Sequence, residues 1–120
     1  MNKMERLAAL GINTEEGLAC CADEEEFYLE MIEEFVREGE QRTADLAKRY
    51  AEQDWKNYVI LVHSLKSTSR MIGADALSEQ ARELEFFARE ENRGQISSLH
   101  GGMMKEYEAL LSALKEIVES

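Results

Sequence analysis

The chain has 120 residues, of which 44% are hydrophobic, so it is long enough and apolar enough to fold as one domain around a single core. It contains no proline and only 7 glycines, which argues against a turn-rich β-sandwich and favours an all-helical fold. Asp and Glu number 25 against 14 Lys and Arg, and the net charge is −11. A protein this acidic is a poor candidate for binding nucleic acid or anionic membrane surfaces.

Neither a membrane-spanning segment nor a secretory signal peptide is expected, because no long apolar run occurs and Glu5 interrupts the weakly apolar N-terminus. The two cysteines, Cys20 and Cys21, are adjacent, and a disulfide between neighbouring residues is strained. They are interpreted as small apolar side chains near a helix end in a reducing compartment. We therefore expect a cytoplasmic protein, and its net charge together with a fully covered core favours a monomer.

The first 22 residues are predicted to form one or two short helical pieces. Gly11 breaks the pattern, and Asn13 or Thr14 restarts it as an N-cap. Asp23 is then expected to cap the first long helix, because three glutamates follow it where the helix dipole favours negative charge. Apolar residues recur at three- and four-residue steps from Phe27 to Tyr50, which predicts one buried stripe.

A second long helix is predicted to start at Asp54 and to end at Gly73. Asp75 is expected to cap a third helix, which ends near residues 92–94, where an Asn-Arg-Gly sequence interrupts the apolar pattern.

A fourth helix is predicted over residues 95–118, with apolar side chains again on one face. Connections of two to four residues place successive helices antiparallel. The expected fold is all-α: an antiparallel up-down-up-down four-helix bundle over residues 23–118. Residues 1–22 form a short N-terminal helical cap, and the whole chain, 1–120, is one domain.

The second helix carries a histidine on its outer face. With an advance of about 100° per residue, His63 lies opposite the side that the apolar residues define. The predicted core-facing residues are Tyr58, Leu61, Leu65 and Ile72, with Val62 and Ser69 just outside that face. His63 is therefore expected to point into solvent, where a surface position without a function is the ordinary alternative.

The neighbours of His63 favour a reactive, partner-facing side chain. Lys66 and Arg70 lie on its flank and could donate charge-assisted hydrogen bonds to phosphate oxygens. Ser67, at the four-residue step, is too small to cover the ring. Three apolar residues on the same solvent side suggest a docking surface: Val59, Ile60 and Met71.

The sequence from His63 to Ala74 resembles the signature of histidine-containing phosphotransfer (HPt) domains, H-x-L-K-G-x-S-x-x-x-G-A. The matching positions are His63, Leu65, Lys66, Ser69, Gly73 and Ala74. Ser67 stands where glycine is commonest, and it keeps the small size that the position requires. The resemblance extends from about Gly11 to the C-terminus and implies the same helical bundle.

The resemblance implies a function in a two-component phosphorelay. His63 would accept a phosphoryl group and exchange it with the aspartate of a response-regulator receiver domain or of a hybrid sensor histidine kinase. Lys66 would hold the phosphoryl oxygens, and Glu85, 22 residues after the histidine, would orient the imidazole through Nδ1. Val59, Ile60, Ser67, Arg70 and Met71 would contact the partner. The chain would need no cofactor or metal of its own, because the Mg²⁺ of the reaction belongs to the receiver domain.

Two other functions of the same fold are alternatives: the phosphoacceptor domain of a larger histidine kinase, and a helical adaptor that is not phosphorylated. A di-metal bundle is excluded, because neither histidine has a glutamate three residues before it. The second histidine, His100, precedes two glycines and is expected to be exposed beside a closely packed or frayed turn.

Overall fold

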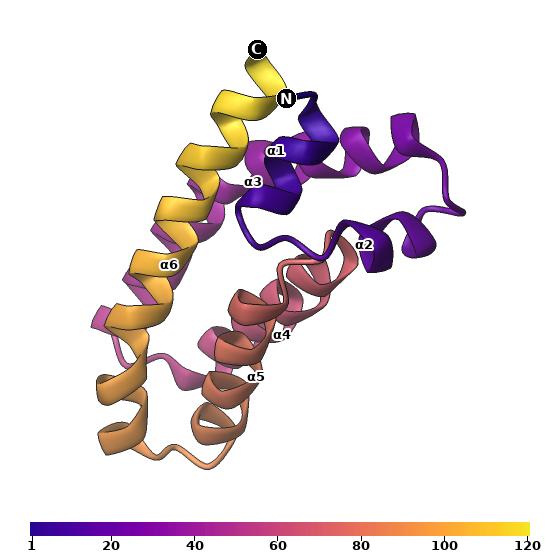
Figure 1. Ribbon diagram of the computed structural model, residues 1–120. Helices are drawn as coiled ribbons and strands as arrows, with labels where there is room; N and C mark the ends of the chain where they lie inside the picture. The colour runs from indigo at the N-terminus through magenta and orange to yellow at the C-terminus, as the bar shows by residue number, and fades with distance from the viewer.

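A computed structural model describes all of residues 1–120, and it consists of six α-helices (Figure 1). Their bounds are α1 (Lys3–Ala9), α2 (Thr14–Cys20), α3 (Glu25–Ala51), α4 (Trp55–Met71), α5 (Asp75–Arg89) and α6 (Arg93–Glu119). None of these helices is both long enough and apolar enough to cross a bilayer.

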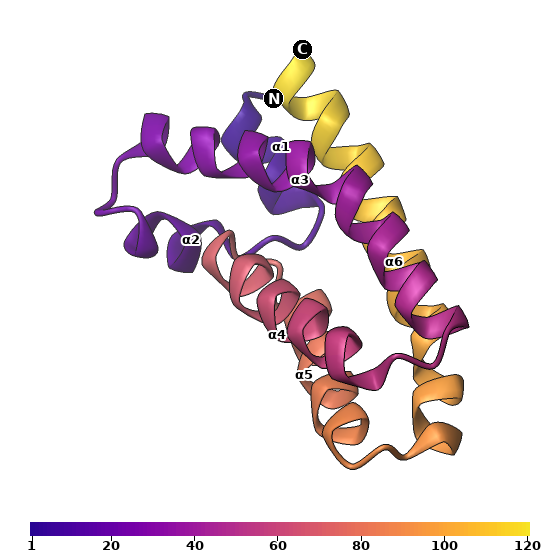
Figure 2. The same ribbon diagram turned by 180° about the vertical axis from the view of Figure 1, so that it is seen from behind.

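The four long helices confirm the predicted bundle. Helix α3 packs against α4, α4 against α5, α5 against α6, and α6 back against α3, so α4 and α6 lie diagonally across the bundle. Both ribbon views show α4 and α5 running side by side as an antiparallel pair (Figures 1 and 2). The core between the helices is filled by large, fully buried side chains, among them Tyr28, Tyr58, Leu65, Leu84 and Met103.

The two short N-terminal helices lie across the end of the bundle where α4 finishes. Helix α1 packs on α6, and α2 packs on α4 and α3 (Figure 1). The backbone N–H of Asn13 donates to the carbonyl of Gly73 at 2.8 Å, and the Tyr28 hydroxyl donates to the carbonyl of Ile72 at 2.7 Å. Gly73 has a φ of +85° and leaves no room for a side chain beside the Asn13 backbone. These contacts fix the C-terminal turn of α4 against the N-terminal segment.

Three helix starts differ from the sequence prediction. Helix α4 was predicted to start at Asp54, and Asp54 is its cap, with the carboxylate accepting the N–H of Asn57. Asp23 does not cap α3: it lies in a turn with a positive φ of 57°, and the helix begins after Glu24 without a side-chain cap. Asp75 is the first residue of α5 rather than its cap. The last helix starts two residues earlier than predicted, because the Asn92 side chain accepts the N–H of Gln95 and caps it there.

The buried face of α4 is rotated slightly from the predicted one. Val62 and Ser69, placed just outside the core by the sequence pattern, are completely buried, whereas Leu61 is only half-buried. The Ser69 hydroxyl is satisfied inside the helix, because it donates to the carbonyl of Leu65 at 2.5 Å. The rotation leaves the main expectation intact, since the side chain of His63 is 54% exposed.

The prediction for His100 was wrong, because this residue is buried and 8% exposed. Its ring stacks on Tyr50 with the centroids 3.8 Å apart, and its Nδ1 lies 2.7 Å from the hydroxyl of Tyr58. Burial lowers the pKa of His100 to about 4, so the ring is neutral at physiological pH. His100 thus belongs to an aromatic cluster in the core, whereas Gly101 and Gly102 lie exposed beside it.

Candidate functional site

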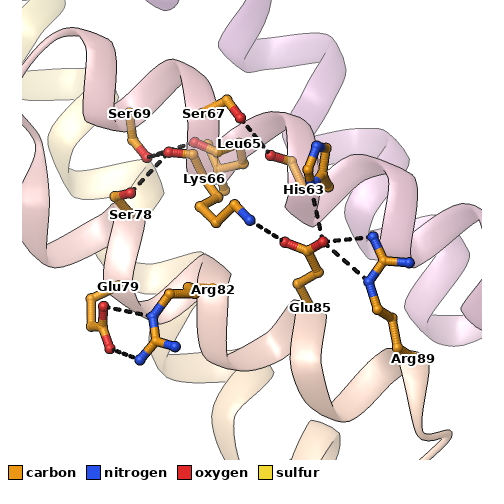
Figure 3. Close-up of polar contacts among 10 residues, drawn as sticks. All are labelled: His63, Leu65, Lys66, Ser67, Ser69, Ser78, Glu79, Arg82, Glu85 and Arg89. Carbon is orange, nitrogen blue, oxygen red and sulfur yellow. Dashed lines mark hydrogen bonds and ion pairs between the residues drawn. The ribbon is translucent and has the colours of Figure 1, made fainter.

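The seam between α4 and α5 brings His63 and Glu85 together. His63 projects outward from the middle of α4, and Glu85 projects from α5 towards it (Figure 3). The imidazole Nδ1 lies 2.9 Å from Oε2 of Glu85. The Glu85 side chain is only 8% exposed, whereas that of His63 is 54% exposed. One edge of the ring is therefore held by the protein, and most of the side chain remains open to solvent.

Glu85 is surrounded by cations. Its Oε1 lies 2.7 Å from Nζ of Lys66, and its Oε2 accepts hydrogen bonds from Nη2 of Arg89 at 2.7 Å and from Nε at 3.2 Å (Figure 3). Burial disfavours the charged carboxylate, but the hydrogen bonds from Lys66, Arg89 and His63 outweigh it and lower the pKa of Glu85 to about 2. The carboxylate is consequently ionised throughout the physiological range.

This ionisation state determines which nitrogen of His63 carries the proton. A carboxylate without a proton can only accept a hydrogen bond, so the contact at 2.9 Å requires the proton to be on Nδ1 of His63. In the neutral ring the lone pair is then on Nε2, at the opposite edge. Nε2 makes no hydrogen bond or ion pair within the chain. The site thus holds the imidazole by Nδ1 and leaves Nε2 unengaged.

The two cationic side chains predicted to flank His63, Lys66 and Arg70, make other contacts than expected. Lys66 is bound to Glu85, with its side chain 29% exposed. Arg70 makes no hydrogen bond or ion pair and lies in a polar cleft beside Lys66 and Ser67. The second cation at the site is Arg89, which was not predicted from the sequence. Its spacing of four residues from Glu85 on one helix was an available signal, because such pairs face each other on a helix.

The predicted apolar residues fall on two sides of α4. Val59 and Ile60 line a groove between α4 and the end of α5, and Ile60 is 60% exposed. Met71, 39% exposed, lines a smaller groove between α3 and α4 instead. Ser67 is exposed one turn after His63, where its hydroxyl donates to the His63 carbonyl at 3.3 Å. That these residues contact a partner stays a prediction.

The chemistry open to this arrangement is nucleophilic attack by Nε2. An exposed imidazole with a fixed tautomer and a buried carboxylate at Nδ1 can take up an electrophilic group from an approaching partner. No group of three or more His, Cys, Asp or Glu side chains is placed to hold a metal ion.

Comparison with known proteins gives a family match and one distant relative. The family model described as Hpt domain matches residues 30–117. A curated relative, the phosphorelay intermediate protein rdeA of Dictyostelium discoideum, is 23% identical over 93 residues, which make up 78% of this chain. The chain spans only 37% of the length of that relative. No solved structure gives a significant match.

Proposed function

Because the chain belongs to the Hpt domain family, we propose that it accepts a phosphoryl group on Nε2 of His63 and exchanges it with the aspartate of a receiver domain in a two-component phosphorelay. The observation that carries this proposal is the hydrogen bond from Nδ1 of His63 to the ionised Glu85, which leaves the lone pair of Nε2 facing outward. The name of the curated relative, a phosphorelay intermediate, supports the same function.

The transfer step follows from this geometry. The lone pair of Nε2 attacks the phosphorus of an aspartyl phosphate, the N–P bond forms, and the P–O bond to the aspartyl oxygen breaks. The aspartate leaves as a carboxylate, and the proton on Nδ1 of His63 stays in place. The ring of the product is consequently cationic, and the negative charge of Glu85 at 2.9 Å stabilises it. The reverse sequence returns the phosphoryl group to an aspartate.

Lys66 and Arg89 adjust the strength of this stabilisation. Both are paired with Glu85, so its negative charge is partly compensated before the reaction begins. Lys66 is the cation that can turn from Oε1 of Glu85 towards a phosphoryl group on His63, because it is on the same helix, three residues further along. The charge of the transferring group itself would be neutralised by Mg²⁺ bound to the receiver domain.

The test is phosphoryl transfer to the purified chain. A Mg²⁺-loaded receiver domain is phosphorylated with acetyl phosphate and mixed with the chain, and acid-labile phosphate on the chain is measured. We expect wild type and His100→Gln to be labelled and His63→Gln to remain unlabelled. Equal labelling of wild type and His63→Gln would contradict the proposal, and so would an unlabelled wild type, which would leave the non-phosphorylated adaptor as the better explanation.

A further inference from the structure

A charged cleft opens on the surface next to the phosphoacceptor, on the side of α4 that follows His63. Its wall is formed by residues of α2, α4 and α5, and none of them is apolar. The lining residues are Glu16, Lys66, Ser67, Arg70, Asp75, Ser78, Glu79 and Arg82. Lys66 and Ser67, which follow His63 by three and four residues, belong to the cleft, so a protein docked over His63 would also cover part of it.

Among the charged residues of this cleft, Arg70 is the only one without a partner in the chain. Arg82 is bound to Glu79, as Figure 3 shows, and Lys66 is paired with Glu85. The two remaining acids, Glu16 and Asp75, both accept hydrogen bonds from the Asn13 side chain, at 2.9 and 3.4 Å. Arg70 is exposed and makes neither a hydrogen bond nor an ion pair.

We propose that Arg70 is a specificity-determining residue of phosphotransfer, whose guanidinium pairs with a carboxylate on the surface of the receiver domain docked over His63. This inference rests on the proposed function. Arg70 follows His63 by seven residues, so the carboxylate would meet α4 about 10 Å along the helix axis from the reacting histidine. A guanidinium suits this task, because its fork of N–H donors matches a carboxylate in geometry as well as in charge.

The charge of the whole chain supports an acidic partner group at this position in particular. With a net charge of −11, most of the surface repels carboxylates. An unpaired arginine beside the site would instead attract a carboxylate of the partner. The cleft wall also includes Glu16, which lies outside residues 30–117 matched by the family model. This rim is therefore partly built by the N-terminal cap, and it can distinguish partners without altering the chemistry at His63.

Arg70 also lies in the last turn of α4, where a cation interacts favourably with the helix dipole. If this were its whole role, its removal would lower the melting temperature and leave transfer between proteins unchanged. The test must therefore separate docking from helix stability and from chemistry at the imidazole.

The experiment measures transfer from a phosphorylated receiver domain that labels wild type, over a range of receiver concentrations. Arg70→Glu is compared with Lys105→Glu, which changes the net charge by the same amount on α6, the helix diagonal to α4. We expect Arg70→Glu to raise KM about tenfold with little change in kcat, because an exposed pair is lost and a repulsion is added. Arg70→Gln should raise KM about threefold, and Lys105→Glu should behave as wild type.

Labelling by phosphoramidate, a small phosphoryl donor without a docking surface, provides the second measurement. Arg70→Glu should react with it at the wild-type rate, and replacing the matching carboxylate of the receiver by arginine should restore its KM. If Arg70→Glu and Lys105→Glu give the same KM, or if Arg70→Glu reacts more slowly with phosphoramidate, the docking role is refuted while His63 remains the phosphoacceptor. If phosphoramidate and receiver both fail to label wild type, the proposed function fails instead.

Discussion

Stability of the chain should depend on pH through His100, whose pKa is lowered from 6.5 to about 4 by burial. Between these two values the unfolded chain binds a proton at His100 that the folded chain does not bind. Stability is thus fully present above pH 6.5 and decreases as the pH falls towards 4. At pH 5 the loss amounts to about 2 kcal/mol relative to pH 7.5. Glu85, with its pKa near 2, contributes to acid unfolding only at lower pH.

The assay is urea unfolding followed by circular dichroism at pH 7.5 and at pH 5. Wild type should lose about 2 kcal/mol between the two conditions, whereas His100→Gln, which keeps an acceptor for the Tyr58 hydroxyl, should lose much less. The chain has only 2 histidines, so His63→Gln is the matched substitution at the other one. It should still lose stability between pH 7.5 and pH 5, because His100 remains buried. If His100→Gln shows the same loss as wild type, buried His100 is not the source of the acid sensitivity.

Three further substitutions test the packing and the site. Gly73→Ala should destabilise the chain by about 3 kcal/mol, because it strains a positive φ and displaces the Asn13 backbone; an unchanged melting temperature would contradict this contact. Gly102→Ala should stabilise α6 by about 1 kcal/mol, since a Cβ there meets nothing within 4 Å. A lower melting temperature would show that the added methyl group does not fit at this position. Lys66→Ala should slow transfer from the receiver about tenfold, with less than about 1 kcal/mol lost in unfolding free energy. A larger loss of stability would mean that the ion pair of Lys66 with Glu85 mainly supports the fold.

The sequence predicted the bundle and the outward direction of His63, because both depend on the spacing of apolar residues along each helix. The prediction from the sequence was less accurate where a single contact determines the local structure. The capping role given to Asp23 failed, since the chain turns there with a positive φ and starts the helix later. The prediction for His100 gave weight to the adjacent glycines, although its spacing from Ile96 and Met103 places it on their buried face.

At the site, the contacts that follow from a residue's position along one helix were predictable from the sequence. The contacts that depend on competition between charged side chains were not. The spacing of 22 residues in the family pattern pointed to Glu85 as the partner of His63, and the structure has the two groups in contact. That Lys66 would be engaged by this same carboxylate depends on how α4 and α5 pack. Arg89, four residues after Glu85, could not be singled out from the sequence, because acid–base pairs at such spacing also occur elsewhere on α3 and α5.

Because Glu85 holds Nδ1 of His63, we propose that Nε2 carries the phosphoryl group. Imidazole nitrogen NMR of the chain after phosphoramidate treatment tests it directly, because the two ring nitrogens give separate signals. We expect a phosphorus coupling to Nε2 of His63, with the proton retained on Nδ1. Phosphorus on Nδ1, or a chain labelled at any residue other than His63, would contradict it.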